Sequence, residues 1–531
     1  MRLFGWIMGG CLALASPAWA QQVPPPTRDS ILVTGERNQA RAKWVRMESP
    51  NFTVYGADEG EARAVTARLE RFDQLLRILT GTPKPERANP LSIYLVSGTT
   101  QLDRLRRQRA QPGFFFTGYY SAAPTGMLVA ADTRWDRLRD RVPRYHDVWL
   151  FTEYSRHFLL QNARGAYLPS WYVDGLSLNL ATTRFDGDVI EYGKGNPSLA
   201  AALESRRWEP LRRIISGDLD HGPLYSAESA LLVHYILAEP ERGRAFGRYL
   251  AEVRAGADRT VAFETAFGAS VNTLHDRLWR YKDKATYIRA TATGFVAPEI
   301  TVSRLPASAD QLLLDQAAMR IGIVEADRQR AVLKRAEDAV ADRSDNLARR
   351  VLAQAQILYG APAAADPTLD ALLALAPDDP ELLYLKGMRH LMAGRADAAR
   401  APAEFREARK WLARVWRADP EYYPALYAWA EALSTEPQFV SENTLNVLLK
   451  AAQLAPQVTQ IQVTAATMML ADGRFDAAAA LLAPITVTPR DPASEQVPAL
   501  LAQARAHGPA DIAQLLAAFR TVAVWKDLNC C

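Results

Sequence analysis

Residues 151–158 read FTEYSRHF and residues 168–176 read LPSWYVDGL, and both the fold and the candidate site depend on these two stretches. The first stretch lies in a pattern with helical apolar spacing, and a second helix is expected to begin near Asp174 after a Pro-containing turn. Glu153 and His157 are four residues apart, so they share one face of the first helix. The sequence therefore predicts polar side chains gathered where two consecutive helices meet.

The chain before these stretches alternates between strand and helix patterns. Runs rich in β-branched and aromatic residues, bounded by turn residues, predict strands, and apolar residues three and four apart predict a helix. Strands are expected at 44–47, 52–55 and 91–96, helices at 59–79 and 100–107, and a β-hairpin at 114–120 and 127–131. This part of the chain is therefore α+β in character, with a small sheet and helices.

The chain after residue 145 is mainly helical in pattern. Helices are expected at 147–161, 174–183, 198–204, 225–237, 242–255, 260–267 and 271–284, followed by a partly extended connection at 291–308. Residues 309–522 are almost entirely helical and rich in Ala and Leu. Because 531 residues are too many for one hydrophobic core, the two patterns predict two domains.

The helical part contains an internal repeat. Residues 391–399 are similar to residues 469–478, and helix ends recur before Pro377, Pro420 and Pro456. A small residue in the turn, alanines on the second helix and a closing proline resemble the tetratricopeptide repeat. The resemblance implies an all-α superhelix with about three recognisable repeats, which would bind a protein or peptide along its surface.

The two quoted stretches resemble the core of the gluzincin metallopeptidases, in particular the bacterial peptidase-MA-like family. That family reads His-Glu-Tyr-Thr-His-His on one helix and Pro-x-Trp-Leu-Asn-Glu-Gly-Leu at the start of the next. The resemblance implies a gluzincin-like domain over residues 43–290. It also implies a Zn²⁺ ion held by two histidines one turn apart and by a carboxylate of the next helix, with a glutamate as general base.

This chain departs from the family pattern at the metal-ligand positions. Thr152 and Arg156 stand where the two histidines belong, and Asp174 replaces the third-ligand glutamate. Glu153 is retained as a vestigial general base, and Tyr225 occupies a family-like position near the cleft. Thr is not a usual Zn²⁺ ligand, and the permanent charge of Arg repels a dication. We expect Arg156 to pair with Glu153 or Asp174, and the site to hold no metal.

An alternative metal site uses different residues of the same helices. Glu153, His157 and Asp174 could together hold zinc, which would make the chain an active metal-dependent peptidase with a non-standard site. The simpler interpretation is that Glu153 and His157 form a helix pair and that His157 is a hydrogen-bonded core residue.

The N-terminal segment has the pattern of an export signal. Arg2 precedes an apolar run at 3–15, and Ala18-Trp19-Ala20 forms a small-x-small cleavage site. Residues 1–20 are therefore predicted to be a signal peptide and residues 21–42 a linker, which gives an exported, soluble and periplasmic protein. A lipid anchor on Cys11 is the disfavoured alternative, because the residues before it match the lipoprotein pattern poorly.

The net charge and the hydropathy of the chain argue against nucleic-acid binding and against a membrane span. The formal net charge of +4 is small for this length and gives no support for nucleic-acid binding. After the signal peptide no stretch is apolar enough to span a membrane. Residues 523–531 are expected to form a tail, and the adjacent Cys530 and Cys531 cannot cross-link a core. The sequence does not indicate their role.

These observations favour an exported, non-catalytic pseudopeptidase whose repeats bind a protein or peptide in the bacterial envelope. An active metallopeptidase-like hydrolase and a purely structural scaffold are the alternatives. Aromatic side chains that are expected in the repeats, either as core or as groove lining, are Trp411, Trp416, Tyr422, Tyr423, Tyr427 and Trp429.

Overall fold

The computed structural model describes most of the chain. The signal peptide predicted at 1–20, all but the last two residues of the predicted linker, and the tail with Cys530 and Cys531 lie outside the described residues. The described ranges are 41–84, 89–109, 117–134, 145–162, 167–193, 197–205, 207–218, 222–291, 294–342, 344–487 and 492–520.

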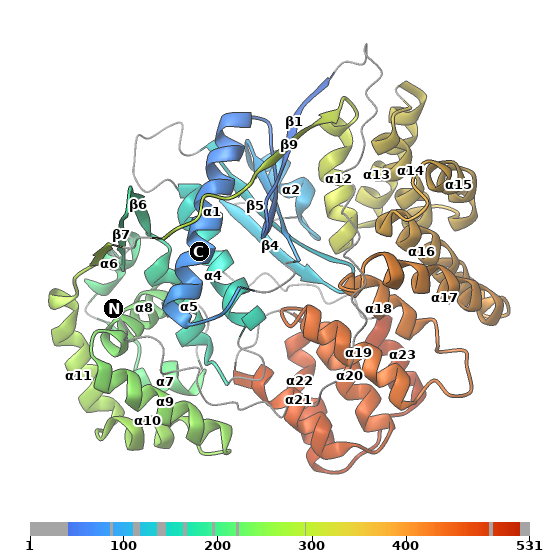
Figure 1. Ribbon diagram of the computed structural model, residues 1–531. Coiled ribbons are helices and arrows are strands. Elements are labelled where there is room, and N and C mark those ends of the chain that lie inside the picture. The colour runs from blue at the N-terminus through green and yellow to red at the C-terminus, as the bar shows by residue number, and fades with distance from the viewer. Residues whose placement is uncertain are drawn as a thin grey trace.

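A six-stranded mixed sheet lies at the centre of the first domain (Figure 1). Its spatial order is β4-β5-β3-β2-β1-β9. β2, β3 and β5 run parallel to one another, while β1, β4 and β9 are antiparallel to their neighbours. The strands are β1 (Arg41–Glu48), β2 (Phe52–Gly56), β3 (Leu91–Val96), β4 (Gly118–Ala123), β5 (Gly126–Asp132) and β9 (Thr301–Pro306).

β9 extends the first domain into the predicted connection. It pairs antiparallel with β1, and Met47 lies opposite Val302. The sheet of the first domain is therefore completed by a strand from the segment 291–308, which the sequence pattern had placed between the domains. The strand was hard to recognise because it is an exposed edge with little apolar alternation.

The two faces of the sheet are covered by different parts of the chain. On β3, Ile93 and Leu95 point into the core formed with α1 (Glu59–Thr80) and α4 (Tyr145–Asn162). The alternate residues Tyr94 and Val96 point to the other face, where they pack against α2 (Thr99–Leu105) and α12 (Ala309–Ile321). Since both faces are buried, β3 reads as a nearly continuous apolar run.

α1 shows why its sequence forms a helix of this length. The Asp58 side chain accepts a hydrogen bond from the Glu61 backbone N–H and caps the start. Gly81 ends the helix in the left-handed region at φ 68°, a conformation that costs glycine little. Both ends lie within one residue of the predicted range.

The rest of the first domain is a helical layer with a small second sheet. The sheet has the order β6-β7-β8, and its strands are too short to show a detectable period in the sequence. These elements are α5 (Ser170–Leu180), β6 (Arg184–Asp186), β7 (Val189–Tyr192), α6 (Pro197–Leu203), α7 (Leu211–Ser216), α8 (Pro223–Leu237), α9 (Pro240–Arg254), α10 (Arg259–Phe267), α11 (Val271–Tyr281), a 3-10 turn (Lys282–Lys284) and β8 (Ile288–Thr291).

The remainder of the described chain is helical and is built largely from antiparallel helix pairs. None of the helices in the described ranges combines the length and the apolar character that a membrane span requires. The helices after α12 are α13 (Ala326–Asp342), α14 (Asn346–Tyr359), α15 (Asp366–Leu375), α16 (Pro380–Ala396), α17 (Ala401–Ala418), α18 (Tyr423–Glu431), α19 (Glu442–Leu454), α20 (Thr459–Ala471), α21 (Phe475–Val487), α22 (Val497–Arg505) and α23 (Ile512–Arg520), with 3-10 turns at Pro362–Ala365 and Pro492–Gln496.

The helical region is docked on the first domain at several places (Figure 1). At the sheet, Leu313 and Ala317 of α12 are buried in one core with Trp44 of β1. Farther along, Tyr423 donates a hydrogen bond to the Ala123 carbonyl at 2.9 Å, and Ser170 donates to the Val487 carbonyl at 3.1 Å. The two domains therefore share buried surface.

A charged network lies where α12 meets the repeats. The Glu381 carboxylate accepts hydrogen bonds from Arg320 of α12 and, at 2.6 Å, from Arg350 of α14. Arg350 also reaches Asp379 at 2.7 Å. Burial opposes ionisation of Glu381, but the two guanidinium groups outweigh it and lower its pKa to about 2.

Replacing Glu381 should weaken the fold in a pH-dependent manner. Its folded pKa lies below the ordinary 4.5, so its contribution is complete above pH 4.5 and is lost as the pH falls toward 2. At neutral pH, Glu381→Gln should cost roughly 1–3 kcal/mol, because two partly buried guanidinium groups lose an ionic partner. Chemical denaturation of both proteins tests this. Equal unfolding free energies at neutral pH would contradict it.

Candidate functional site

The first quoted stretch lies in α4, and the second begins α5. α5 starts at Ser170, four residues before the predicted start, because the Pro169 carbonyl accepts a hydrogen bond from the Val173 N–H at 3.1 Å. Asp174 is therefore inside α5, facing α4. The sequence placed both helices correctly but missed the start of the second.

Arg156 bridges the two carboxylates of the site. Its Nη1 donates to Glu153 Oε1 at 2.5 Å, and its Nε donates to Asp174 Oδ1 at 3.0 Å. The Glu153 and Asp174 side chains are 7% and 15% exposed, whereas Arg156 is 32% exposed. The pairing predicted for Arg156 is thus present with both acids, and it joins α4 to α5.

Tyr225 completes this cluster from α8. Its hydroxyl donates to Asp174 Oδ2 at 3.3 Å. Burial, followed by the charge of Asp174, raises the pKa of Tyr225, so the phenol stays protonated and acts as a donor. The structure therefore brings together four of the predicted site residues, namely Glu153, Arg156, Asp174 and Tyr225.

Burial is the main influence on the pKa of Glu153. It raises the pKa of this carboxyl, and the nearby Asp174 raises it further, while Arg156 acts in the opposite direction. The guanidinium therefore offsets the repulsion between two carboxylates that share one pocket.

Thr152 faces its own helix. Its hydroxyl donates to the Val148 carbonyl at 2.7 Å, the usual bond of a buried Thr within a helix. In this arrangement the hydroxyl serves the α4 backbone and not the cluster of carboxylates.

His157 is engaged on another side of α4. Its Nδ1 lies 3.2 Å from the Tyr120 hydroxyl of β4, and its Nε2 lies 3.3 Å from Gln457 Nε2. Gln457 belongs to the turn between α19 and α20, and it also donates to Gln161 at 2.6 Å. His157 thus links the first domain to the helical region.

As they lie, these residues do not fit a zinc ion. A guanidinium occupies the space between Glu153 and Asp174, and the imidazole of His157 is bonded to Tyr120 and Gln457. In the part of the chain that the structure describes, no group of three or more His, Cys, Asp or Glu side chains is placed to hold a metal. The cluster is instead a polar contact between three helices, in which one guanidinium pairs with two acids.

A glycine sets the distance between two of these helices. A Cβ on Gly175 would lie 2.3 Å from the Ser229 carbonyl oxygen, so α5 and α8 approach as closely as only glycine permits. This close approach brings Tyr225 within reach of Asp174. The Asp-Gly pair in the second quoted stretch is the sequence signal for it.

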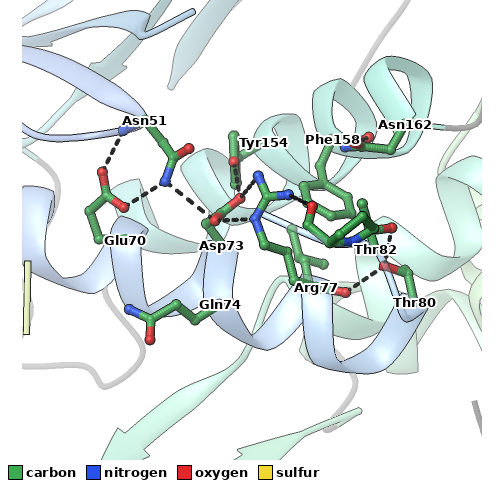
Figure 2. A network of polar contacts seen from close by, with 12 residues as sticks. Asn51, Glu70, Asp73, Gln74, Arg77, Thr80, Thr82, Tyr154, Phe158 and Asn162 are labelled. Carbon is green, nitrogen blue, oxygen red and sulfur yellow. Dashed lines mark hydrogen bonds and ion pairs between the residues drawn. The ribbon is translucent and has the colours of Figure 1, made fainter. Parts of the chain in front are cut away.

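A second polar network holds α4 through Tyr154 (Figure 2). The Tyr154 hydroxyl donates to Asp73 Oδ1 at 2.6 Å, and Arg77 donates to the same carboxylate at 2.7 Å. Asn51 joins Asp73 to Glu70, to which it donates from both its backbone and its side chain at 2.7 Å. The turn before β2, α1 and α4 are therefore tied together next to Glu153.

The sequence did not reveal this second network. Glu70 and Asp73 are 3% and 2% exposed although they lie on a helix with a polar outer face. The sequence signal for their burial is their position, because Glu70 follows Leu69 and Asp73 follows Phe72. Leu69 and Phe72 both belong to the apolar stripe of the helix. A carboxylate at the edge of such a stripe is buried only if a partner from elsewhere satisfies it.

The predicted repeat aromatics are mainly core. Tyr423 and Tyr427 are buried, and Tyr427 lies 3.0 Å from the Thr464 hydroxyl. Trp411, Tyr422 and Trp429 are partly buried against the same helices. Trp416 is 42% exposed and is the one of the six that faces solvent. Trp416 is thus available on the surface, and Tyr422 lines a small pocket together with Tyr384 and Met388.

No protein-family profile and no curated protein matches the chain. A solved structure that is similar is a thermophilic TPR protein from Thermus thermophilus, at 21% sequence identity and a TM-score of 0.31. The similarity covers 38% of this chain and 100% of that one.

The buried imidazole of His157 should make stability depend on pH. Burial lowers its pKa to about 4, whereas an imidazole in the unfolded chain titrates near 6.5. Below pH 6.5 the unfolded chain takes up the proton first, so the contribution is complete above pH 6.5 and is lost toward pH 4.

His157→Gln should therefore flatten the fall in unfolding free energy across this window. Urea denaturation of wild type and variant from about pH 7 to about pH 4 measures the difference. His507→Gln is the matched control, because His507 is exposed. A variant with the same pH profile as wild type would show that His157 titrates normally.

Proposed function

We propose that this chain is an exported, non-catalytic pseudopeptidase whose helical-repeat domain binds a protein or peptide in the bacterial envelope. The observation that carries the proposal is the bridge from Arg156 to Glu153 and Asp174. In a zinc peptidase of the kind the sequence resembles, the position of Arg156 carries a histidine ligand. Here Arg156 supplies a permanent positive charge that pairs with Glu153 and Asp174. In a zinc peptidase the corresponding acids would bind the metal and activate its water.

The proposal assigns Glu153 a structural role. A general base must accept a proton from a bound water, and this requires an accessible carboxylate within hydrogen-bond reach of that water. Glu153 is 7% exposed, and its Oε1 is already bonded to Arg156. Loss of Glu153 would therefore disturb the contact between α4 and α5 rather than remove a catalytic step.

An active peptidase with a non-standard site is the second candidate. The observation that favours it is the raised pKa of Glu153, since burial that raises a carboxylate pKa is also how enzymes tune a general base. It requires Arg156 to leave the two acids and His157 to leave Gln457. Metal binding separates the two candidates.

Restoring two histidines tests the resemblance directly. Thr152→His with Arg156→His places two imidazoles one turn apart beside Glu153 and Asp174. This variant should take up roughly one zinc per chain, whereas wild type should take up much less than one. Metal content after chelation and zinc titration is the measurement. A matched control is Arg330→His with Lys334→His, which places the same pair on exposed positions of α13.

The outcomes distinguish the candidates. About one zinc per wild-type chain, lost in both Glu153→Ala and Asp174→Ala, would establish the metal-dependent alternative. Zinc uptake by the control pair equal to that of the site pair would show that two added histidines suffice anywhere. A folded site variant that takes up no zinc would contradict the descent of this site from a metal centre.

Partner binding by the repeats is better tested with point variants than with truncations. Removing the helical region would expose the sheet face that α12 covers, with Trp44, Tyr94 and Val96. Trp416, on the solvent side of α17, is the natural position for a substitution that leaves the core intact.

A further inference from the structure

A basic groove lies between α9 and α11, on the opposite side of the molecule from α13–α17 (Figure 1). Its volume is about 820 Å³. Six basic and two acidic side chains line it. The groove therefore carries an excess of four positive charges.

The basic side chains of the groove differ in whether they are bonded within the fold. Arg242 is committed to the fold, because its guanidinium lies 3.7 Å from the centroid of the Tyr235 ring and bonds to Glu239 at 2.6 Å. By contrast, Arg277 and Arg280 are exposed, and their guanidinium groups make no hydrogen bond or ion pair to another residue that the structure describes. The α11 wall of the groove therefore presents guanidinium groups that are available to a ligand.

The opposite wall adds a second row. Arg244 and Arg248 are exposed on α9, and Arg244 makes only a 3.5 Å contact to Glu241, which is 86% exposed. Such an exposed pair contributes little and can be exchanged for a ligand carboxylate. Arg248 donates to the Ala266 carbonyl at 2.9 Å, which uses one of the five donors of its guanidinium. Phe267, at the end of α10, provides apolar surface between the rows.

We infer that this groove binds an extended acidic peptide segment. The planar guanidinium donates two parallel hydrogen bonds that match a carboxylate. Arg244 and Arg248 are one helical turn apart, about 6 Å along the axis. In an extended peptide, alternate side chains lie on one side about 7 Å apart. A peptide with an acid at every second position can therefore place successive carboxylates against successive arginines.

The shape of the site favours a peptide over an anionic membrane surface. The arginines face a groove between two helices, and a flat bilayer cannot enter it. The inference does not depend on the proposed function, because α9 and α11 contribute no residue to the cluster around Arg156. It places a second binding surface on the first domain, separate from the repeats.

Fluorescence anisotropy with the whole purified chain tests the inference. The probes are labelled peptides of alternating Glu and Ala, with alternating Gln and Ala as the uncharged comparison. We expect binding of the Glu peptide only, weakening as salt is added. Arg277→Glu with Arg280→Glu should weaken it at least about tenfold.

The matched control makes the same charge change elsewhere. Arg330→Glu with Arg406→Glu replaces two exposed arginines of α13 and α17, and it should change affinity by less than about twofold. Arg277→Gln with Arg280→Gln is the milder variant, and thermal unfolding verifies the fold of each protein.

Three results would overturn the inference. In the first, wild type does not bind the Glu peptide at low salt. In the second, the groove variant and the control variant lose the same affinity. In the third, wild type binds phosphatidylglycerol vesicles but does not bind the peptide. The last would assign the groove to anionic lipid instead.

Discussion

The burial of both faces of one sheet holds this molecule together. One face is covered by α1 and α4 of the first domain, and the other is covered by α2 together with α12, the first helix of the helical region. An apolar face left in water would oppose folding by roughly 25 cal/mol for each Å² exposed. The second domain is therefore a structural requirement of the first, and the two should fold and unfold as a coupled unit.

The same coupling reaches the candidate site. α4 is held by α1 through Tyr154 and Asp73, by α5 through Arg156, and by the helical region through His157 and Gln457. Each contact satisfies a polar group that burial would otherwise penalise. α4 is thus held by three different parts of the fold. Its polar residues serve as connections between parts of the fold.

The position of Arg156 between two carboxylates has an electrostatic reason. Two carboxylates in a buried pocket repel each other, and a metal ion or a cation must offset that repulsion. A guanidinium does so with directed hydrogen bonds and without a coordination geometry to satisfy. Tyr225 adds a further donor to Asp174, and Gly175 allows the close helix packing that makes this contact possible.

Sequence alone determined much of this description. Local patterns placed the β1–β2 pair, β3, α1, α4 and most later helices, because their apolar periods and caps are properties of short segments. The resemblance of the two quoted stretches to a metallopeptidase core also singled out Glu153, Arg156, Asp174 and Tyr225. The separation into an α+β part and a helical part followed from the change in pattern along the chain.

Only the tertiary structure decided how these pieces meet. The pairing of β9 with β1, the small β6-β7-β8 sheet and the contact of α12 with the sheet join segments far apart in the sequence, and no local period encodes them. The partners of His157, Glu70 and Asp73 likewise come from other elements. A buried polar residue shows that a partner must exist, but only the packed chain shows which residue supplies it.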